Sequence, residues 1–408
     1  MLTTCLPGFV SMRHVLFIAA SLATGVVPTL AAQGRIRLPV GLGELEQRVR
    51  TDSSDAAAHY NVALGYWNAK RYEDVQRELQ VALAIEPRFA PAHLALAYLP
   101  FARRPRLWDD IYKRNRPDSI VQLVTEWRSH ERAALLIDPL VNLAIIGATR
   151  PGKDVRWDMY EGARDYYEIF YQGYDDIEQG RYDDAYYNFN RLLDMYREQV
   201  SRDPKRAPEE WIWWRALAAS RVPEKFQIAI DDFQELLARS VGRERSDTVY
   251  HVPLNTNEIR YFIATVHHRA GKNDEAVRLY REVLGNDIGM YMANVKLGDL
   301  FEAQRRYPEA IVERQNAIST NPDDPSLHLD LGITLGKAGE FAKAIAELEV
   351  AAESAPRDPR PAFWLGIAHL QVNNRDAAKS HFTRFVQMAP SRMGPQVAMA
   401  RQRLAELE

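Results

Sequence analysis

A constant spacing between repeated residues in the last third of the chain constrains the fold more than any other feature. The dipeptides Leu297-Gly298, Leu331-Gly332 and Leu365-Gly366 recur at one fixed interval. The same interval relates two further sets, which are Pro322, Pro356 and Pro390, and Ala276, Ala310, Ala344 and Ala378. A period of about 34 residues with this content indicates a unit of two helices that stacks on copies of itself.

The segment 326–339 shows how the first helix of such a unit is built. Leu327, Leu331 and Leu335 form a one-sided apolar row at helical spacing. Gly332 lies beside this row, at a place where a side chain would hold two helices apart, so closer packing offsets its helix-propensity cost of roughly 1 kcal/mol. Gly339 then allows a tight turn.

The second helix of this unit begins at Phe341 and ends before Pro356. Its narrow face of small and apolar residues consists of Ala344, Leu348, Ala351 and Ala352. Neither helix is able to bury its apolar side alone, so stability has to come from stacking.

These residues resemble the tetratricopeptide repeat (TPR) family. The resemblance implies an all-α fold, a right-handed α-solenoid of stacked helix-turn-helix repeats. Four regular units are expected over residues 257–390, beginning near Asn257, Tyr291, Pro325 and Pro359, with a capping helix over 391–408. Residues 33–150 are expected to hold N-terminal units with an insertion, and residues 151–256 irregular units rich in Tyr and Trp.

The segment 1–32 differs from the rest of the chain. Arg13 and His14 precede an apolar run of the length found in secretory signals, and small residues follow it. We expect a signal peptide over 1–32, cleaved near Ala31 or Ala32, and hence an exported, periplasmic or envelope-associated protein; a retained N-terminal anchor is the alternative. The only cysteine, Cys5, would be lost on cleavage.

Motifs for catalysis or cofactor binding are missing from the sequence. It has no HExxH, no GxSxG, no GxxxxGK[ST] and no glycine-rich dinucleotide turn. His267 and His268 are adjacent, so on a helix they point about 100° apart and are poorly placed to share a metal. The formal charge of −3 gives no field that would attract nucleic acid. The sequence therefore predicts neither enzyme activity nor a cofactor, a metal site or a nucleic-acid partner.

The TPR resemblance implies a peptide-binding groove, because in that family the first helices of the units line a concave face. Carried over position by position, it predicts two rows of groove residues, which are Tyr261, Val295, Leu329 and Phe363, and Thr265, Asp299, Ile333 and Ile367. The groove is largely apolar toward its C-terminal end, which suits a hydrophobic segment of a protein partner. The alternative is that some of these residues pack against neighbouring units.

One subset of TPR proteins uses Lys, Asn and Arg at set groove positions to hold the C-terminal carboxylate of a chaperone. At those positions this chain offers residues such as Val295, Asp299 and Asp330, so that ligand is not expected.

The segment 157–196 supplies the alternative function, recognition of a glycan or cell-envelope polymer. Tyrosines stand among aspartates there, a combination that binds sugars or cationic groups. The candidate residues are Tyr166, Tyr167, Tyr171, Tyr174 and Tyr186. Tyrosine used simply to fill the space between helices is the competing interpretation. The main expectation is an exported, non-catalytic scaffold that binds a protein or peptide partner.

Overall fold

The structure, a computed structural model, describes residues 40–104, 107, 118–138, 166, 169–170, 172–173, 176–177, 180–199, 207–241 and 256–408. The predicted signal peptide lies outside these residues, as does most of the insertion after Arg104. Within the described residues the regular elements are seventeen α-helices and two 3₁₀ helices, without a strand. The all-α class is confirmed.

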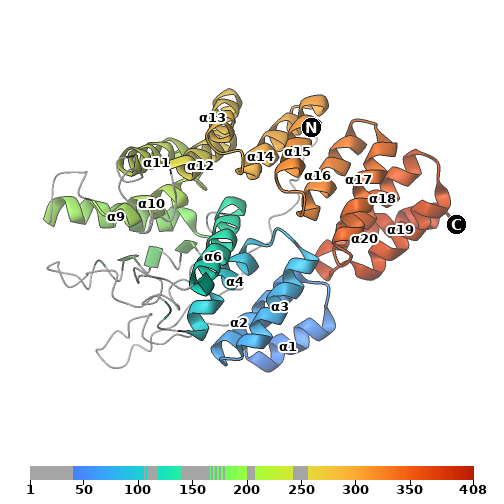
Figure 1. Cartoon of the computed structure of the whole chain (residues 1–408), viewed down its shortest axis with the longest axis horizontal. Helices are drawn as coiled ribbons and strands as arrows, with labels where there is room; N and C mark the ends of the chain where they lie inside the picture. Colours follow the sequence, from blue (N-terminus) through green and yellow to red (C-terminus); the bar gives the residue numbers. More distant parts are fainter. Residues whose placement is uncertain are drawn as a thin grey trace.

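The helices come in consecutive antiparallel pairs that form a solenoid (Figure 1). The N-terminal helices are α1 (Leu42–Thr51), α2 (Ala56–Asn68), α3 (Tyr72–Ile85), α4 (Ala90–Arg103) and α6 (Asp118–Ile137). The middle of the chain gives α9 (Tyr182–Gln199), α10 (Glu209–Ala219), η4 (Pro223–Lys225) and α11 (Phe226–Ser240).

The C-terminal helices form four regular pairs and a single last helix. They are α12 (Thr256–Arg269), α13 (Asn273–Asn286), α14 (Tyr291–Ala303), α15 (Tyr307–Thr320), α16 (Pro325–Lys337), α17 (Phe341–Ser354), α18 (Arg360–Gln371), α19 (Arg375–Met388), η5 (Ser391–Met393) and α20 (Gly394–Glu406).

The turn inside each C-terminal pair repeats with the sequence period. A residue with positive φ stands at 271, 305, 339 and 373, and the values lie between 57° and 84°. Glycine supplies this conformation at Gly271 and Gly339, as expected for the second of these. Arg305 and Asn373 adopt it without glycine. The turn geometry is therefore set by the stacked helices even where the residue type does not favour it.

A close approach between the two helices of a pair explains the periodic glycine. A Cβ atom on Gly332 would lie 2.6 Å from Cγ of Leu348 and 3.2 Å from the carbonyl oxygen of Ala344. One repeat later, a Cβ on Gly366 would lie 2.7 Å from the ring of Phe382. The prediction that Gly332 permits close packing is confirmed.

The expected apolar faces are buried. Leu327, Leu331 and Leu335 of α16 are at most 4% exposed, and Ala344 and Leu348 of α17 at most 1%. Burial of this surface against the partner helix and the neighbouring pair is the main favourable contribution to folding.

The N-terminal helices lie across the open side of the arc that the later helices form (Figure 1). In that view α6 lies between α1–α4 and α12–α13, and α20 lies near one end of helix α3. The core joins the two parts at α6. Its Leu136 belongs to the large cluster that runs to α16, while Ala134 belongs to the cluster of α1–α4, and Leu135 and Ile137 pack against both.

Replacing Ala344 tests the packing of the pair. The Ala344→Leu variant should be less stable by about 1–3 kcal/mol, because the added carbons have no space in the seam beside Gly332. Ala346→Leu on the exposed face of the same helix is the matched control. Urea unfolding measures both, and equal midpoints for the two variants would contradict the placement of this seam.

Candidate functional site

The first regular unit is covered on its inner face by α6. The guanidinium of Arg132 lies 2.9 Å from the Glu258 carboxylate and 2.7 Å from that of Asp287. The hydroxyl of Tyr261 donates a hydrogen bond of 3.0 Å to the backbone carbonyl of Leu136. Burial raises the pKa of Tyr261 well above its ordinary value, so the hydroxyl stays protonated as a donor.

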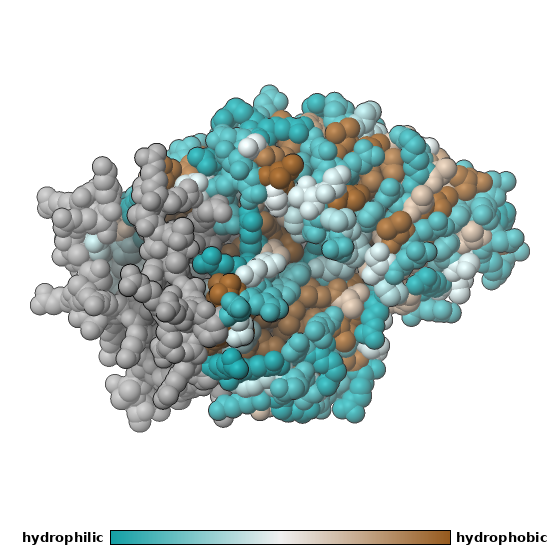
Figure 2. Space-filling model, viewed as in Figure 1, coloured by the Kyte–Doolittle hydropathy of each residue, from teal (hydrophilic) through white to brown (hydrophobic). Residues whose placement is uncertain are grey.

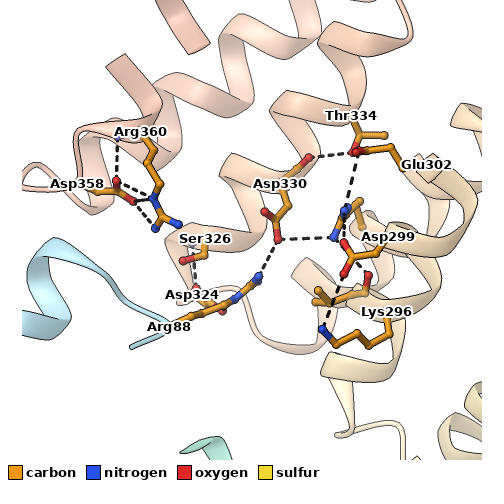
Figure 3. A network of polar contacts seen from close by, with 12 residues as sticks. Arg88, Lys296, Asp299, Glu302, Asp324, Ser326, Asp330, Thr334, Asp358 and Arg360 are labelled. Carbon is orange, nitrogen blue, oxygen red and sulfur yellow. Dashed lines mark hydrogen bonds and ion pairs between the residues drawn. The ribbon is translucent and has the colours of Figure 1, made fainter. Parts of the chain in front are cut away.

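Further along the same face, the turn between α3 and α4 contributes Arg88. Its Nε donates to Asp324 at 2.9 Å and its Nη1 donates to Asp330 at 2.6 Å (Figure 3). Burial alone would lower the pKa of Arg88, but the carboxylates of Asp330 and Asp324 outweigh it and raise the pKa above its ordinary value. The contact joins residues 236 and 242 positions apart in the chain.

Asp324 has a second role at the start of α16. Its carboxylate accepts a hydrogen bond from the backbone N–H of Ser326 at 2.9 Å, which caps the helix. One repeat later Asp358 accepts the N–H of Arg360 in the same way, and the Arg360 side chain also binds it at 2.6 Å. At the position equivalent to Arg360, the preceding repeat has Ser326, which carries no positive charge. The carboxylate of Asp324 is therefore paired with the guanidinium of Arg88 instead.

Arg314 of α15 is the buried centre of the site. Its side chain is 5% exposed, donates to Asp299 at 2.7 Å and lies 3.6 Å from Asp330. It occupies the seam position that Leu348 and Phe382 occupy in the next two units, since a Cβ on Gly298 would lie 3.0 Å from its Nε. A charged residue here replaces a hydrophobic one.

The remaining members of this inner-face network extend it along α14 and α16. Glu302 accepts from the hydroxyl of Thr334 at 2.6 Å and from Lys337 at 2.5 Å. Lys296 lies 3.9 Å from Asp299. Burial would raise the pKa of Asp299, but Arg314 and Lys296 outweigh it and hold the pKa below its ordinary value. The Asp299 carboxylate is therefore ionised and paired near neutral pH.

A second set of polar contacts connects the N-terminal turns with η5. Arg392 lies 2.9 Å from Glu86 and 3.3 Å from Asp55. Asp52 accepts hydrogen bonds from the backbone N–H and the hydroxyl of Ser391, at 3.0 and 2.9 Å. The solenoid is thus closed on itself by its two ends.

The first row of predicted groove residues is buried. Tyr261, Val295, Leu329 and Phe363 are 1%, 3%, 2% and 8% exposed. Phe363 packs against the rings of Phe382 and Phe385. In this structure these four side chains pack inside the molecule, because α6 and the helix pairs themselves cover them.

The second row, Thr265, Asp299, Ile333 and Ile367, is partly exposed. Asp299 is engaged by Arg314, and Thr265 is in hydrogen-bond contact with the hydroxyl of Tyr280 at 3.3 Å. Ile367 lines a cavity of about 400 Å³ between α18 and α20, together with Leu370, Gln371, Arg375, Arg403, Glu406 and Leu407. That these residues bind a peptide stays a prediction.

The tyrosine-rich segment is described only in part. Tyr167, Tyr171 and Tyr174 lie outside the described residues. Tyr166 is fully buried and stacks on Trp211, and Tyr186 is half-buried with the Lys225 ammonium 4.9 Å from its ring centre. At these two positions tyrosine fills space between helices.

The described residues offer no group of three or more His, Cys, Asp or Glu side chains placed to hold a metal. Among the same residues, none of the helices is long and apolar enough to span a bilayer. On the visible face, hydrophobic side chains lie on the N-terminal helices near the centre and in separate patches over the later helices (Figure 2).

The sequence patterns did not lead to a prediction of Arg88 or Arg314 as site residues. For Arg314 a signal was present, since alignment at the repeat period places it with Tyr280, Leu348 and Phe382. Nothing in the repeat pattern pointed to Arg88, because its partners lie in a unit far along the chain.

Comparison with known families assigns part of the regular array. Two models described as tetratricopeptide repeat match residues 261–325 and 301–362. Residues 261–362 therefore consist of tetratricopeptide repeats. A search of curated proteins found no match.

Among solved structures, a MamA crystal structure is 20% identical over 42% of this chain and 92% of its own, with a TM-score of 0.35. MamA from Desulfovibrio magneticus RS-1 is 18% identical over 42% and 94%, with a TM-score of 0.34. The C-terminal part of a TPR repeat-containing protein from Cytophaga hutchinsonii is 16% identical over 60% and 84%, with a TM-score of 0.43. At these values the likeness says nothing of what this chain binds.

Removal of the Arg314 charge tests the network. Arg314→Met keeps an apolar chain in the seam but leaves the Asp299 carboxylate without its main partner, so unfolding free energy should fall by about 1–3 kcal/mol. Adding Asp299→Asn should restore part of this loss. Arg278→Met, at a side chain 58% exposed, is the control and should change stability by about 0.5 kcal/mol or less. Urea unfolding of the wild type and the three variants at pH 7 is the measurement.

A pair of histidines beside Arg88 predicts a pH dependence. Nδ1 of His93 lies 3.1 Å from Nδ1 of His130, and Nε2 of His93 lies 3.0 Å from the carbonyl of Pro87. Burial lowers the pKa of both residues. The Nδ1 contact needs one donor and one acceptor, so only one proton fits between the two rings.

Because these pKa values are lowered on folding, their contribution to stability is complete above the unfolded value of about 6.5 and is lost as the pH falls through the folded values. Urea unfolding at pH 7.5 and pH 5.5 should show this loss. His130→Asn should reduce this loss of stability at pH 5.5. Part of the pH dependence should remain, because His267, His268 and His381 also have lowered pKa values. An unchanged pH dependence in the variant would count against the pair.

Proposed function

We propose that this TPR protein is a non-catalytic scaffold that binds a hydrophobic segment of a protein partner at the C-terminal end of its inner face. The cavity beside Ile367 is the observation that carries the proposal. It is formed at the end of the array that α6 and Arg88 do not cover, and it includes a residue of the predicted groove. The TPR family, whose members generally act as non-catalytic scaffolds, supports the proposal further.

The lining of the cavity favours one kind of occupant. Ile367, Leu370 and Leu407 supply an apolar surface, while Arg375 and Arg403 stand among the lining residues. Arg403 is paired with Glu406 at 2.7 Å, and Arg375 donates to the carbonyl of Glu406 at 3.0 Å. A large hydrophobic side chain of the partner fits this surface, with polar backbone or side chains toward the arginines.

We also propose that the protein works outside the cytoplasm, at the cell envelope. The charged, apolar and small-residue order of segment 1–32 supports this location. The intact mass of the protein purified from its native cells checks the idea, because removal of residues 1–32 is expected.

A charge in the cavity should abolish partner binding. Ile367→Asp places a carboxylate where the partner would bury an apolar group, and affinity should fall about tenfold or more. Val350→Asp introduces the same charge at an exposed residue of α17 and should have no effect. Affinity capture from the envelope fraction, quantified by mass spectrometry, compares the two variants with the wild type. Partners retained equally by both would overturn the assignment of this site.

A further inference from the structure

We propose that the polar contacts between the turns of α1–α4 and the later part of the solenoid form a clasp that opens and closes. The clasp consists of Arg88 with Asp324 and Asp330, Arg392 with Glu86 and Asp55, and Ser391 with Asp52. When closed, it holds α1–α4 over the inner face of the regular array. The proposal concerns the exposure of the inner face that α1–α4 cover, and it does not depend on binding at the cavity beside Ile367.

The two attachments of the N-terminal helices differ in kind. At α6 the attachment has a continuous hydrophobic part in addition to the polar contacts of Arg132, since Leu135 and Ile137 pack against both of the large core clusters. Among the described residues, no core cluster combines side chains of α1–α4 with side chains of α16–α20. The contact at the clasp is carried by ion pairs and hydrogen bonds. The α6 attachment therefore persists while the clasp separates, and α6 acts as the pivot.

The clasp is weak enough to open. The side chains of Arg88, Asp324 and Asp330 are 16%, 10% and 25% exposed, and those of Arg392 and Glu86 are 30% and 23% exposed. The Arg392 pair, which solvent reaches, is worth little and is partly screened by salt. The Arg88 pairs are largely buried, so the cost of desolvating their charges offsets much of their attraction. Nη2 of Arg88 is also buried without a hydrogen-bond acceptor among the described residues, which lowers the gain from closing.

Both halves of the clasp belong to one rigid unit. Arg88 and Glu86 lie in the turn between α3 and α4, and Asp52 and Asp55 lie in the turn between α1 and α2. The core cluster of α1–α4 holds these two turns in a fixed relation. Loss of the Arg392 contact should therefore loosen the Arg88 contact, although the two arginines do not touch the same residues.

Small-angle X-ray scattering of the full chain tests the motion at about 0.05 M and about 0.5 M NaCl, where the Debye length falls from ~14 Å to ~4 Å. The wild type should have a larger radius of gyration and maximum dimension at high salt. The double variant Arg88→Ala, Arg392→Ala should already be expanded at low salt. Arg77→Ala, which removes a local pair on α3, is the control and should match the wild type.

Carbodiimide labelling of carboxylates, read by mass spectrometry, tests the coupling. In Arg392→Ala the labelling of Asp324 and Asp330 should rise several-fold, because both become accessible when the clasp opens. A purely local role of Arg392 would leave them unchanged. Circular dichroism checks that each variant keeps its helical content, and Asp330→Asn provides a second variant that conserves side-chain size and should also expand the protein.

Equal scattering of the wild type and the folded double variant at both salt concentrations would overturn the clasp, as would unchanged labelling in Arg392→Ala. Neither measurement uses a partner. A failure of Ile367→Asp to reduce partner binding would count against the proposed function alone.

Discussion

Every part of this molecule depends on the stacking of helix pairs that are too short to be stable alone. Even α13 and α17, among the longest helices of the regular array, have only 14 residues each, a length at which an isolated helix is marginal in water. Each helix becomes stable because one apolar face is buried against its partner and against the next pair. The close approach at Gly332 and Gly366 shows how little space remains in the seam. A change in one seam is therefore passed to its neighbours as a change in packing.

The solenoid is held together by two kinds of contact, and the difference has consequences for function. Along the chain, neighbouring pairs are joined by hydrophobic surface, and α6 extends that surface to helices further along. Between the turns of α1–α4 and the later part of the solenoid, the contacts are polar and centred on Asp324, Asp330 and Arg392. Hydrophobic stabilisation grows with buried area, whereas ion pairs add little, because salt screens the exposed ones and desolvation offsets the buried ones. The array is thus joined by a continuous hydrophobic core, whereas its closure is polar.

Sequence periodicity predicted the regular pairs because the repeat records local packing. Gly332, Leu348 and Gly339 have the roles that their positions in the repeat indicated, since each acts on residues in the same unit. The same reasoning placed Tyr261 in a groove, but its hydroxyl binds the carbonyl of Leu136, from a helix that the repeat pattern does not relate to it. Arg314 could have been noticed as a charge in a hydrophobic seam position. Arg88 could not, because its partners depend on the curvature summed over several units.

The sequence by itself determined the class of the protein: an all-α array of stacked pairs, with the positions of its turns and seams in the regular part. These follow from a constant repeat period and from local sterics, which act over a few residues. The tertiary structure alone decided which inner surface is covered and which is left open beside Ile367. It also decided that the two ends meet. That choice depends on the cumulative rotation of one pair on the next, a quantity that residue types do not encode one unit at a time.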